Sequence, residues 1–72
     1  MSGVVFGREW NITTAAEYRA AMNELADAEF IAEMSDSYAV TRREKDEIDR
    51  QRENVLRQAK ENNILKEETK NA

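Results

Sequence analysis

Two helix-start signatures divide this chain, and no proline interrupts the residues that follow them. Each signature is a threonine with a glutamate three positions later, at residues 14–17 and 41–44. In such a capping box the threonine hydroxyl accepts a hydrogen bond from the third backbone amide, and the glutamate bonds back to the threonine amide. The sequence therefore predicts two helices, over about residues 14–34 and 41–62.

The short connection makes the two helices antiparallel neighbours, so the predicted fold class is all-α, an antiparallel helical hairpin over residues 14–62. Residues 1–13 combine aromatic and β-branched side chains without helical spacing. They predict an extended arm that covers the core, or a short strand. Residues 63–72 are mostly polar and are expected to form a flexible C-terminal tail, although Asn62 and Asn63 can close the second helix in a left-handed turn with Ile64 folded back on it.

Length and composition limit how stable one copy can be. The 72 residues make one small domain, and 40% hydrophobic residues are too many for a fully disordered acidic chain. There is no cysteine for a disulfide and no histidine to help hold zinc. Small chains without such links often gain stability by association, so we expect a homodimer or larger bundle that completes the hairpin.

The first predicted helix carries apolar residues on two sides. One face repeats at intervals of three and four: Tyr18, Ala21, Met22, Leu25, Ala28 and Ala32. At 100° per residue, Phe30, Ile31 and Met34 lie largely on the opposite side. Either the helix breaks or bends near Asp27, or it continues straight and buries one side against its own chain and the other against another molecule. We favour the second alternative and predict that Phe30, Ile31 and Met34 mediate association.

Two of the three aromatic residues outside both predicted helices are candidate anchors for a partner. Trp10 is in the arm and Tyr38 is in the predicted connection. Aromatic side chains often dominate the binding energy of interfaces, so both are candidate anchors for a partner protein. The alternative for Trp10, and likewise for Tyr38, is burial against the protein's own helices or a second copy.

The second predicted helix has a thin apolar seam and many arginines. Ile48, Val55 and Asn62 are seven residues apart, flanked by Leu56 and Ala59. Four arginines of this helix could contact nucleic acid: Arg42, Arg43, Arg50 and Arg57. Carboxylates interrupt them, and we expect ion pairs between Asp46 and Arg50 and between Glu53 and Arg57 instead.

Composition also argues against several function classes. Without histidine or cysteine the usual acid–base and nucleophilic groups are missing, so we expect no enzyme and no catalytic residues. Gly3 and Gly7 are the only glycines, and neither begins a phosphate-binding loop, so no cofactor site is expected. Glu29 and Glu33 are spaced as two metal ligands could be, but metal sites in helical bundles add histidines, so we expect no metal.

Charge is distributed unevenly along the chain. The net charge is −4, and residues 1–40 contain two arginines against seven acidic residues. This balance disfavours nucleic acid and anionic membranes as partners and favours a protein with a basic surface. No apolar run near the start is long enough for a signal peptide or a membrane span, so we expect a cytoplasmic location and no membrane partner.

Residues 12–21, Ile-Thr-Thr-Ala-Ala-Glu-Tyr-Arg-Ala-Ala, look like the opening of the helix that precedes the DNA-binding module of HigA-like antitoxins. The likeness covers ten of the 72 residues and implies a small bacterial or phage regulator that works by contact with another protein. The sequence thus predicts a small, acidic, non-enzymatic protein–protein interaction module, a bacterial or phage regulatory or assembly protein that acts as a homo-oligomer. The alternative is a nucleic-acid-associated transcriptional regulator or antitoxin-like protein that uses its arginine-rich second helix.

Overall fold

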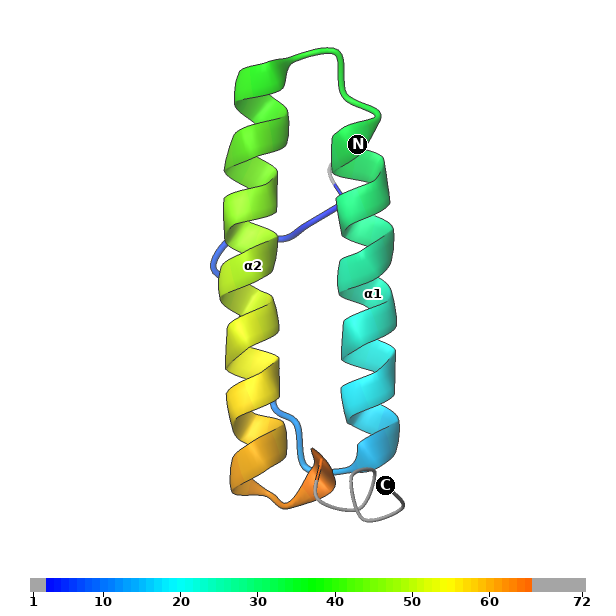
Figure 1. The fold of residues 1–72 in the computed structure, drawn as a ribbon, viewed down its shortest axis with the longest axis vertical. Coiled ribbons are helices and arrows are strands. Elements are labelled where there is room, and N and C mark those ends of the chain that lie inside the picture. Colours follow the sequence, from blue (N-terminus) through cyan, green and yellow to red (C-terminus); the bar gives the residue numbers. More distant parts are fainter. Residues whose placement is uncertain (1–2, 66–72) are drawn as a thin grey trace.

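The computed structural model describes residues 3–65, and residues 66–72 of the predicted flexible tail lie outside this part. Helix α1 spans Ala15–Glu33 and helix α2 spans Tyr38–Glu61. The two helices lie side by side and run in opposite directions (Figure 1). Residues 3–65 contain no strand. The predicted fold class, an all-α helical hairpin, is confirmed.

Helix α1 begins with the predicted capping box. The Glu17 amide donates to the Thr14 hydroxyl at 3.1 Å, and the Glu17 carboxylate accepts from the Thr14 amide at 3.1 Å. The same carboxylate also accepts from the hydroxyl and the amide of Thr13, and these bonds lower the pKa of Glu17. The helix continues past Asp27 to Glu33 as one element, so the alternative of a break near Asp27 is wrong.

Helix α2 begins earlier than predicted, and the second capping box is wrong. The N-cap is Ser37, whose hydroxyl accepts from the Val40 amide at 3.3 Å. Thr41 lies inside the helix, where its hydroxyl contacts the carbonyl oxygens of Ala32, at 2.9 Å, and Ser37, at 3.0 Å. The start at Ser37 therefore adds nearly a turn to the helix and lets Thr41 tie the two helix ends together. Tyr38 becomes the first residue of α2.

The core is thin and contains many small side chains. Helix α1 buries Ala21, Leu25, Ala28 and Ala32, and α2 buries Ile48, Gln51, Val55 and Ala59. The predicted turn after α2 is present, because Asn63 has a φ of 61° and Ile64 is buried in the same core. Alanine at this interface allows the two helices to approach closely but leaves little apolar volume between them.

The arm supplies the missing core residues. It starts beside α1, crosses over α2 and returns to the start of α1 (Figure 1). Val4 and Ile12 are buried in the core, and Trp10 packs against it. The arm covers the core as a third layer.

Candidate interaction surface

The largest group of exposed apolar side chains lies where the two helices are joined. We call this group the turn end; its members are Phe30, Ile31, Met34, Tyr38 and Val40. Phe30 is 64% exposed, Met34 69% and Tyr38 77%. They come from the last turn of α1, its C-cap and the first turn of α2. All three predicted association residues and one predicted anchor therefore lie at one end of the hairpin.

The members of the turn end have different surroundings. A Cβ atom placed on Gly3 would lie 3.1 Å from Cβ of Ile31 and 2.9 Å from Cα of Ala28, so the arm packs closely beside Ile31. Phe30 and Met34 are four residues apart and lie away from the face that packs on α2. The guanidinium of Arg42 lies 3.5 Å from the Tyr38 hydroxyl. The bare surface is therefore centred on Phe30 and Met34.

Ion pairs fix α2 against α1 beside this surface. Lys45 pairs with Glu33 at 3.3 Å, and Arg52 pairs with Glu29 at 3.1 Å. Partly exposed pairs of this kind contribute only about 0 to 1 kcal/mol each to stability. Their main effect is to hold one edge of α2 to α1, and they engage the two glutamates that were considered as metal ligands. Residues 3–65 contain no group of acidic side chains that could hold a metal ion.

The opposite edge of α2 holds the arm. We call this the amide edge; it consists of Glu47, Gln51, Gln58 and Asn62. The Gln51 side chain donates to the Val5 carbonyl at 2.7 Å and accepts from the Trp10 indole at 2.9 Å. Gln51 is itself buried, so both halves of its amide need these partners.

Gln58 and Asn62 continue the same pattern. Gln58 donates to the Trp10 carbonyl at 2.7 Å and accepts from the Ile12 amide at 2.8 Å, and Asn62 donates to the Ile12 carbonyl at 2.5 Å. An extended segment normally satisfies these backbone groups by pairing with a strand. Here side-chain amides on a helix replace that strand.

Sequence reasoning missed the role of the amide edge. The available signal is that Gln51 and Gln58 are seven residues apart and Asn62 follows four later, so all three border the Ile48–Val55 seam. Asn62 was predicted to belong to the seam and, with Asn63, to close the helix, but not to bond to the arm.

Glu47 is the charged member of the amide edge. Its carboxylate accepts from the Gly7 amide at 2.9 Å, from Gln51 at 2.6 Å and from Arg50 at 2.5 Å. The Arg50 hydrogen bonds, followed by that of Gln51, lower the pKa of Glu47 from 4.5 to about 2. Gly7 has a φ of 77°, a conformation that glycine adopts easily, so the arm can bend here and present its amide to Glu47.

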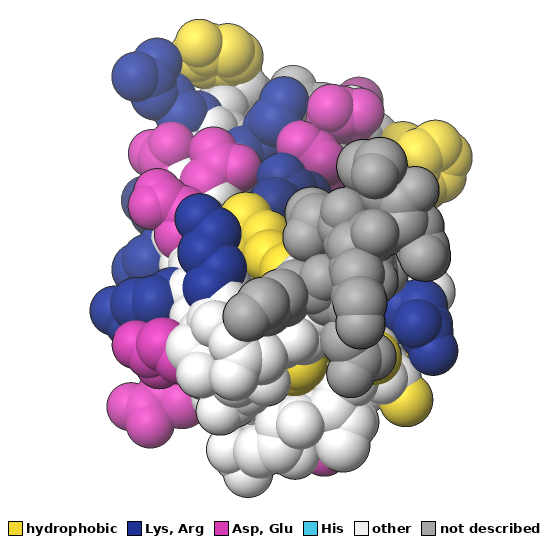
Figure 2. Space-filling view, turned by 60° about the horizontal axis from the view of Figure 1, so that its bottom comes forward, with side chains coloured by type: hydrophobic (Ala, Val, Ile, Leu, Met, Phe, Trp, Pro, Cys, Tyr) yellow, Lys and Arg dark blue, Asp and Glu magenta, His cyan; other side chains and the backbone are white. Residues whose placement is uncertain are grey.

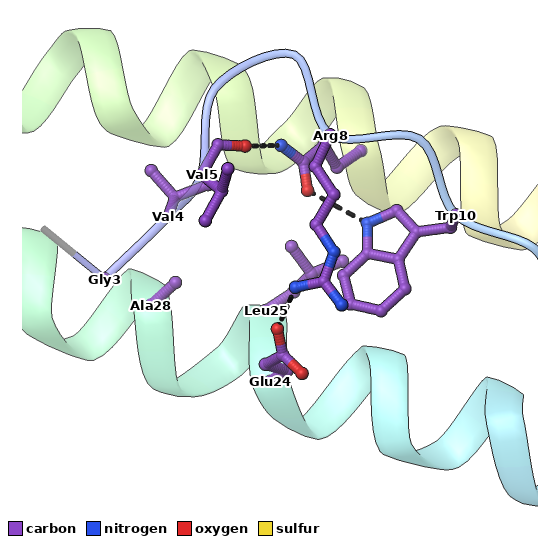
Figure 3. Close-up of a pocket in the computed structure, with 9 residues that line it drawn as sticks. Gly3, Val4, Val5, Arg8, Trp10, Glu24, Leu25 and Ala28 are labelled. Carbon is purple, nitrogen blue, oxygen red and sulfur yellow. Dashed lines mark hydrogen bonds and ion pairs between the residues drawn. The ribbon is translucent and has the colours of Figure 1, made fainter.

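Trp10 is held within the chain. The Arg8 guanidinium lies 3.7 Å from the centre of the Trp10 ring and pairs with Glu24 of α1 (Figure 3). The indole N–H bonds to Gln51 on the other side. Because its polar atom and one ring face are engaged, Trp10 fits the alternative of burial against its own helices, and its role as a partner anchor stays a prediction.

The pocket that the arm forms with both helices together is too small for a ligand. Residues from the arm, α1 and α2 line it, including Val5, Arg8 and Leu25 (Figure 3). It encloses about 10 Å³. This is about the space of one water molecule, so it offers no room for a substrate or cofactor.

The arginines proposed as nucleic-acid contacts are mixed with carboxylates. The predicted pairs are wrong: Arg50 bonds to Glu47 rather than Asp46, and no ion pair joins Glu53 and Arg57 in residues 3–65. Glu47 is three residues from Arg50 and is already held by the arm, which favours this pairing. Arg50, Glu53 and Arg57 line one open depression. Figure 2 shows Lys and Arg side chains interspersed with Asp and Glu on the visible face.

Comparisons with family models, curated proteins and solved structures find no match. The likeness of residues 12–21 to antitoxins therefore stays a local resemblance. Neither α1 nor α2 has the length and apolar character that a membrane-spanning helix requires. The turn end is the largest group of exposed apolar side chains on the described surface.

Proposed function

We propose that this chain is a cytoplasmic, non-enzymatic protein–protein interaction module, a bacterial or phage regulatory or assembly protein that associates through its turn end. The observation that carries the proposal is the exposure of Phe30 and Met34, 64% and 69%, one helical turn apart. Clustered apolar side chains of this size on a small protein mark an interaction site. In residues 3–65 the arm reaches only the side of Ile31 and leaves them open.

If the partner is a different protein rather than a second copy, the negative charge of the hairpin favours one with a basic surface. The net charge is −4, and Asp27 is an exposed acidic residue close to Phe30 along α1. An acidic residue beside an apolar centre, on a chain of negative net charge, favours encounter with a basic surface over an acidic one.

Nucleic-acid binding is the second candidate function. It is favoured by Arg43 and Arg57, which make no ion pair within residues 3–65. Against it, Glu53 lies in the same depression as Arg57, and Glu47 engages Arg50. Binding to duplex DNA that weakens steeply with salt would support this candidate. No binding at low salt would eliminate it.

Substitution of Phe30→Asp tests the proposed function. We expect the variant to have a lower average mass than the wild type in analytical ultracentrifugation over a wide concentration range. Its helical circular dichroism should be retained, because Phe30 is exposed and outside the core. Val5→Asp is the matched control, since it introduces the same charge at a similarly exposed apolar residue and should leave the mass unchanged. A wild type that is monomeric throughout and binds no protein would overturn the proposal, as would an oligomer that Phe30→Asp does not weaken.

A further inference from the structure

A second regular stripe runs along the side of α1 that faces away from α2. Its spacing alternates between four and three residues, which is the spacing of a coiled-coil seam. We call it the outer stripe; its members, all exposed, are Ala16, Ala20, Asn23, Asp27, Phe30 and Met34. The side chains of the stripe are small at its N-terminal end, polar in the middle, and large and apolar at its C-terminal end.

We infer that the outer stripe is the docking site for a second copy of this chain, with the two α1 helices antiparallel. This inference rests on the proposed function and specifies the partner and the register. In this register Phe30 lies opposite Ala20 of the second copy, and Met34 lies opposite Ala16. A twofold axis relates the copies, so each contact occurs twice.

Side-chain size supports the antiparallel register. The two large residues of the stripe, Phe30 and Met34, are at one end, and the two alanines are at the other. Antiparallel pairing places each large side chain over a small one, so the helices stay at a constant distance along the seam. Parallel pairing stacks Phe30 on Phe30 and Ala20 on Ala20, which crowds one end and leaves a gap at the other.

The polar middle of the stripe supports the same register. Antiparallel pairing brings the Asn23 amide of one copy to the Asp27 carboxylate of the other, and the amide donates a hydrogen bond to it. Parallel pairing brings the two Asp27 carboxylates together in one layer, where like charges repel. Asn23 and Asp27 in the middle of the stripe therefore disfavour the parallel arrangement.

Charges beside the stripe are also complementary. On the flank nearer α2, Arg19 lies opposite Glu33 of the second copy, and Ala26 lies next to its own equivalent at the twofold axis. Arg19 makes no ion pair within residues 3–65, so its charge is available, and Glu33, which Lys45 already holds from α2, would accept it as a second partner. On the other flank the two copies of Glu24 approach each other, and the Arg8 already paired with each Glu24 offsets their repulsion.

Single cysteines test the register, because the chain has no cysteine of its own. Ala26→Cys and Ala16→Cys are matched variants, since both replace exposed alanines of α1. Under mild oxidation we expect Ala26→Cys to form a disulfide-linked dimer readily. Ala16→Cys should not link to itself but should link to Met34→Cys when the two variants are mixed.

The pattern of cross-links separates the inference from the proposed function. Self-linking of Ala16→Cys without Ala26→Cys would show a parallel pair and overturn the antiparallel register. An oligomer that Phe30→Asp weakens, but in which none of these cysteines link, would place the contact off the outer stripe and also overturn the inference. In both cases the proposed function stands. A chain that is monomeric and binds no protein contradicts both.

Discussion

The part of the hairpin that the arm covers differs from the turn end in how its apolar residues are covered. Beneath the arm, Val4 and Ile12 complete the core, and the amide edge satisfies the backbone that comes with them. At the turn end no described segment covers Phe30 and Met34, which stay exposed. Stability and association are therefore located in different parts of the molecule, and substitutions should separate them.

The largest expected effect is at Ile12, the arm residue with the deepest burial. It is 1% exposed, and Ile12→Ala should lower the free energy of unfolding by about 2 to 5 kcal/mol because it leaves a cavity in a thin core. Urea denaturation followed by circular dichroism measures this loss. Val5→Ala, at an exposed position of the same arm, is the control and should change stability by less than about 0.5 kcal/mol. Equal effects at the two positions would contradict the assignment of the arm to the core.

The second largest effect is a pH dependence that comes from Glu47. Its pKa is lowered to about 2 in the folded chain, so between pH 4.5 and 2 the unfolded chain binds a proton that the folded chain does not. This group therefore stabilises the fold above pH 4.5, and the contribution disappears as the pH falls towards 2. We expect Glu47→Gln to be less stable than the wild type near neutral pH by about 2 kcal/mol. The difference should vanish near pH 2.

Glu53→Gln is the matched control for this prediction. The Glu53 side chain makes no hydrogen bond or ion pair within residues 3–65, so its substitution should leave the stability of the fold nearly unchanged near neutral pH. A Glu47→Gln variant that shows the same pH profile as the wild type would mean that the carboxylate does not hold the arm.

Some parts of the fold can be predicted from the sequence alone. The first capping box, the buried face of α1 and the closing turn at Asn63 depend on residues within a few positions of each other, and all were predicted. The start of α2 was not, because Ser37 and Thr41 are both competent caps. The choice between them depends on the Ala32 carbonyl across the turn, which gives the Thr41 hydroxyl a partner only when α2 starts at Ser37.

The amide edge could not be assigned from the sequence for a related reason. Gln51 bonds to Val5 and Trp10, which precede it by more than 40 residues. A glutamine beside an apolar seam is also compatible with simple solvation, so its partner is known only once the path of the arm is known. The exposure of Phe30 and Met34, in contrast, could be expected from the sequence, because both residues lie off the apolar face of α1 that repeats at intervals of three and four.

The smallest of the arm effects is expected for Gln51, and it tests whether the arm is held by specific hydrogen bonds or only by its apolar residues. Gln51→Ala leaves the Trp10 indole without its partner and leaves the Val5 carbonyl only the longer bond from the Arg8 amide, at 3.4 Å, which should cost about 1 kcal/mol of unfolding free energy. Hydrogen exchange should show faster exchange of the Ile12 amide, because the arm opens more often, while amides in the middle of α1 change less. Asn11→Ala, at an exposed arm residue, is the control. If Gln51→Ala and Asn11→Ala have the same small effect, the buried side chains alone fix the arm, and the contrast between the two halves of the hairpin is one of apolar burial only.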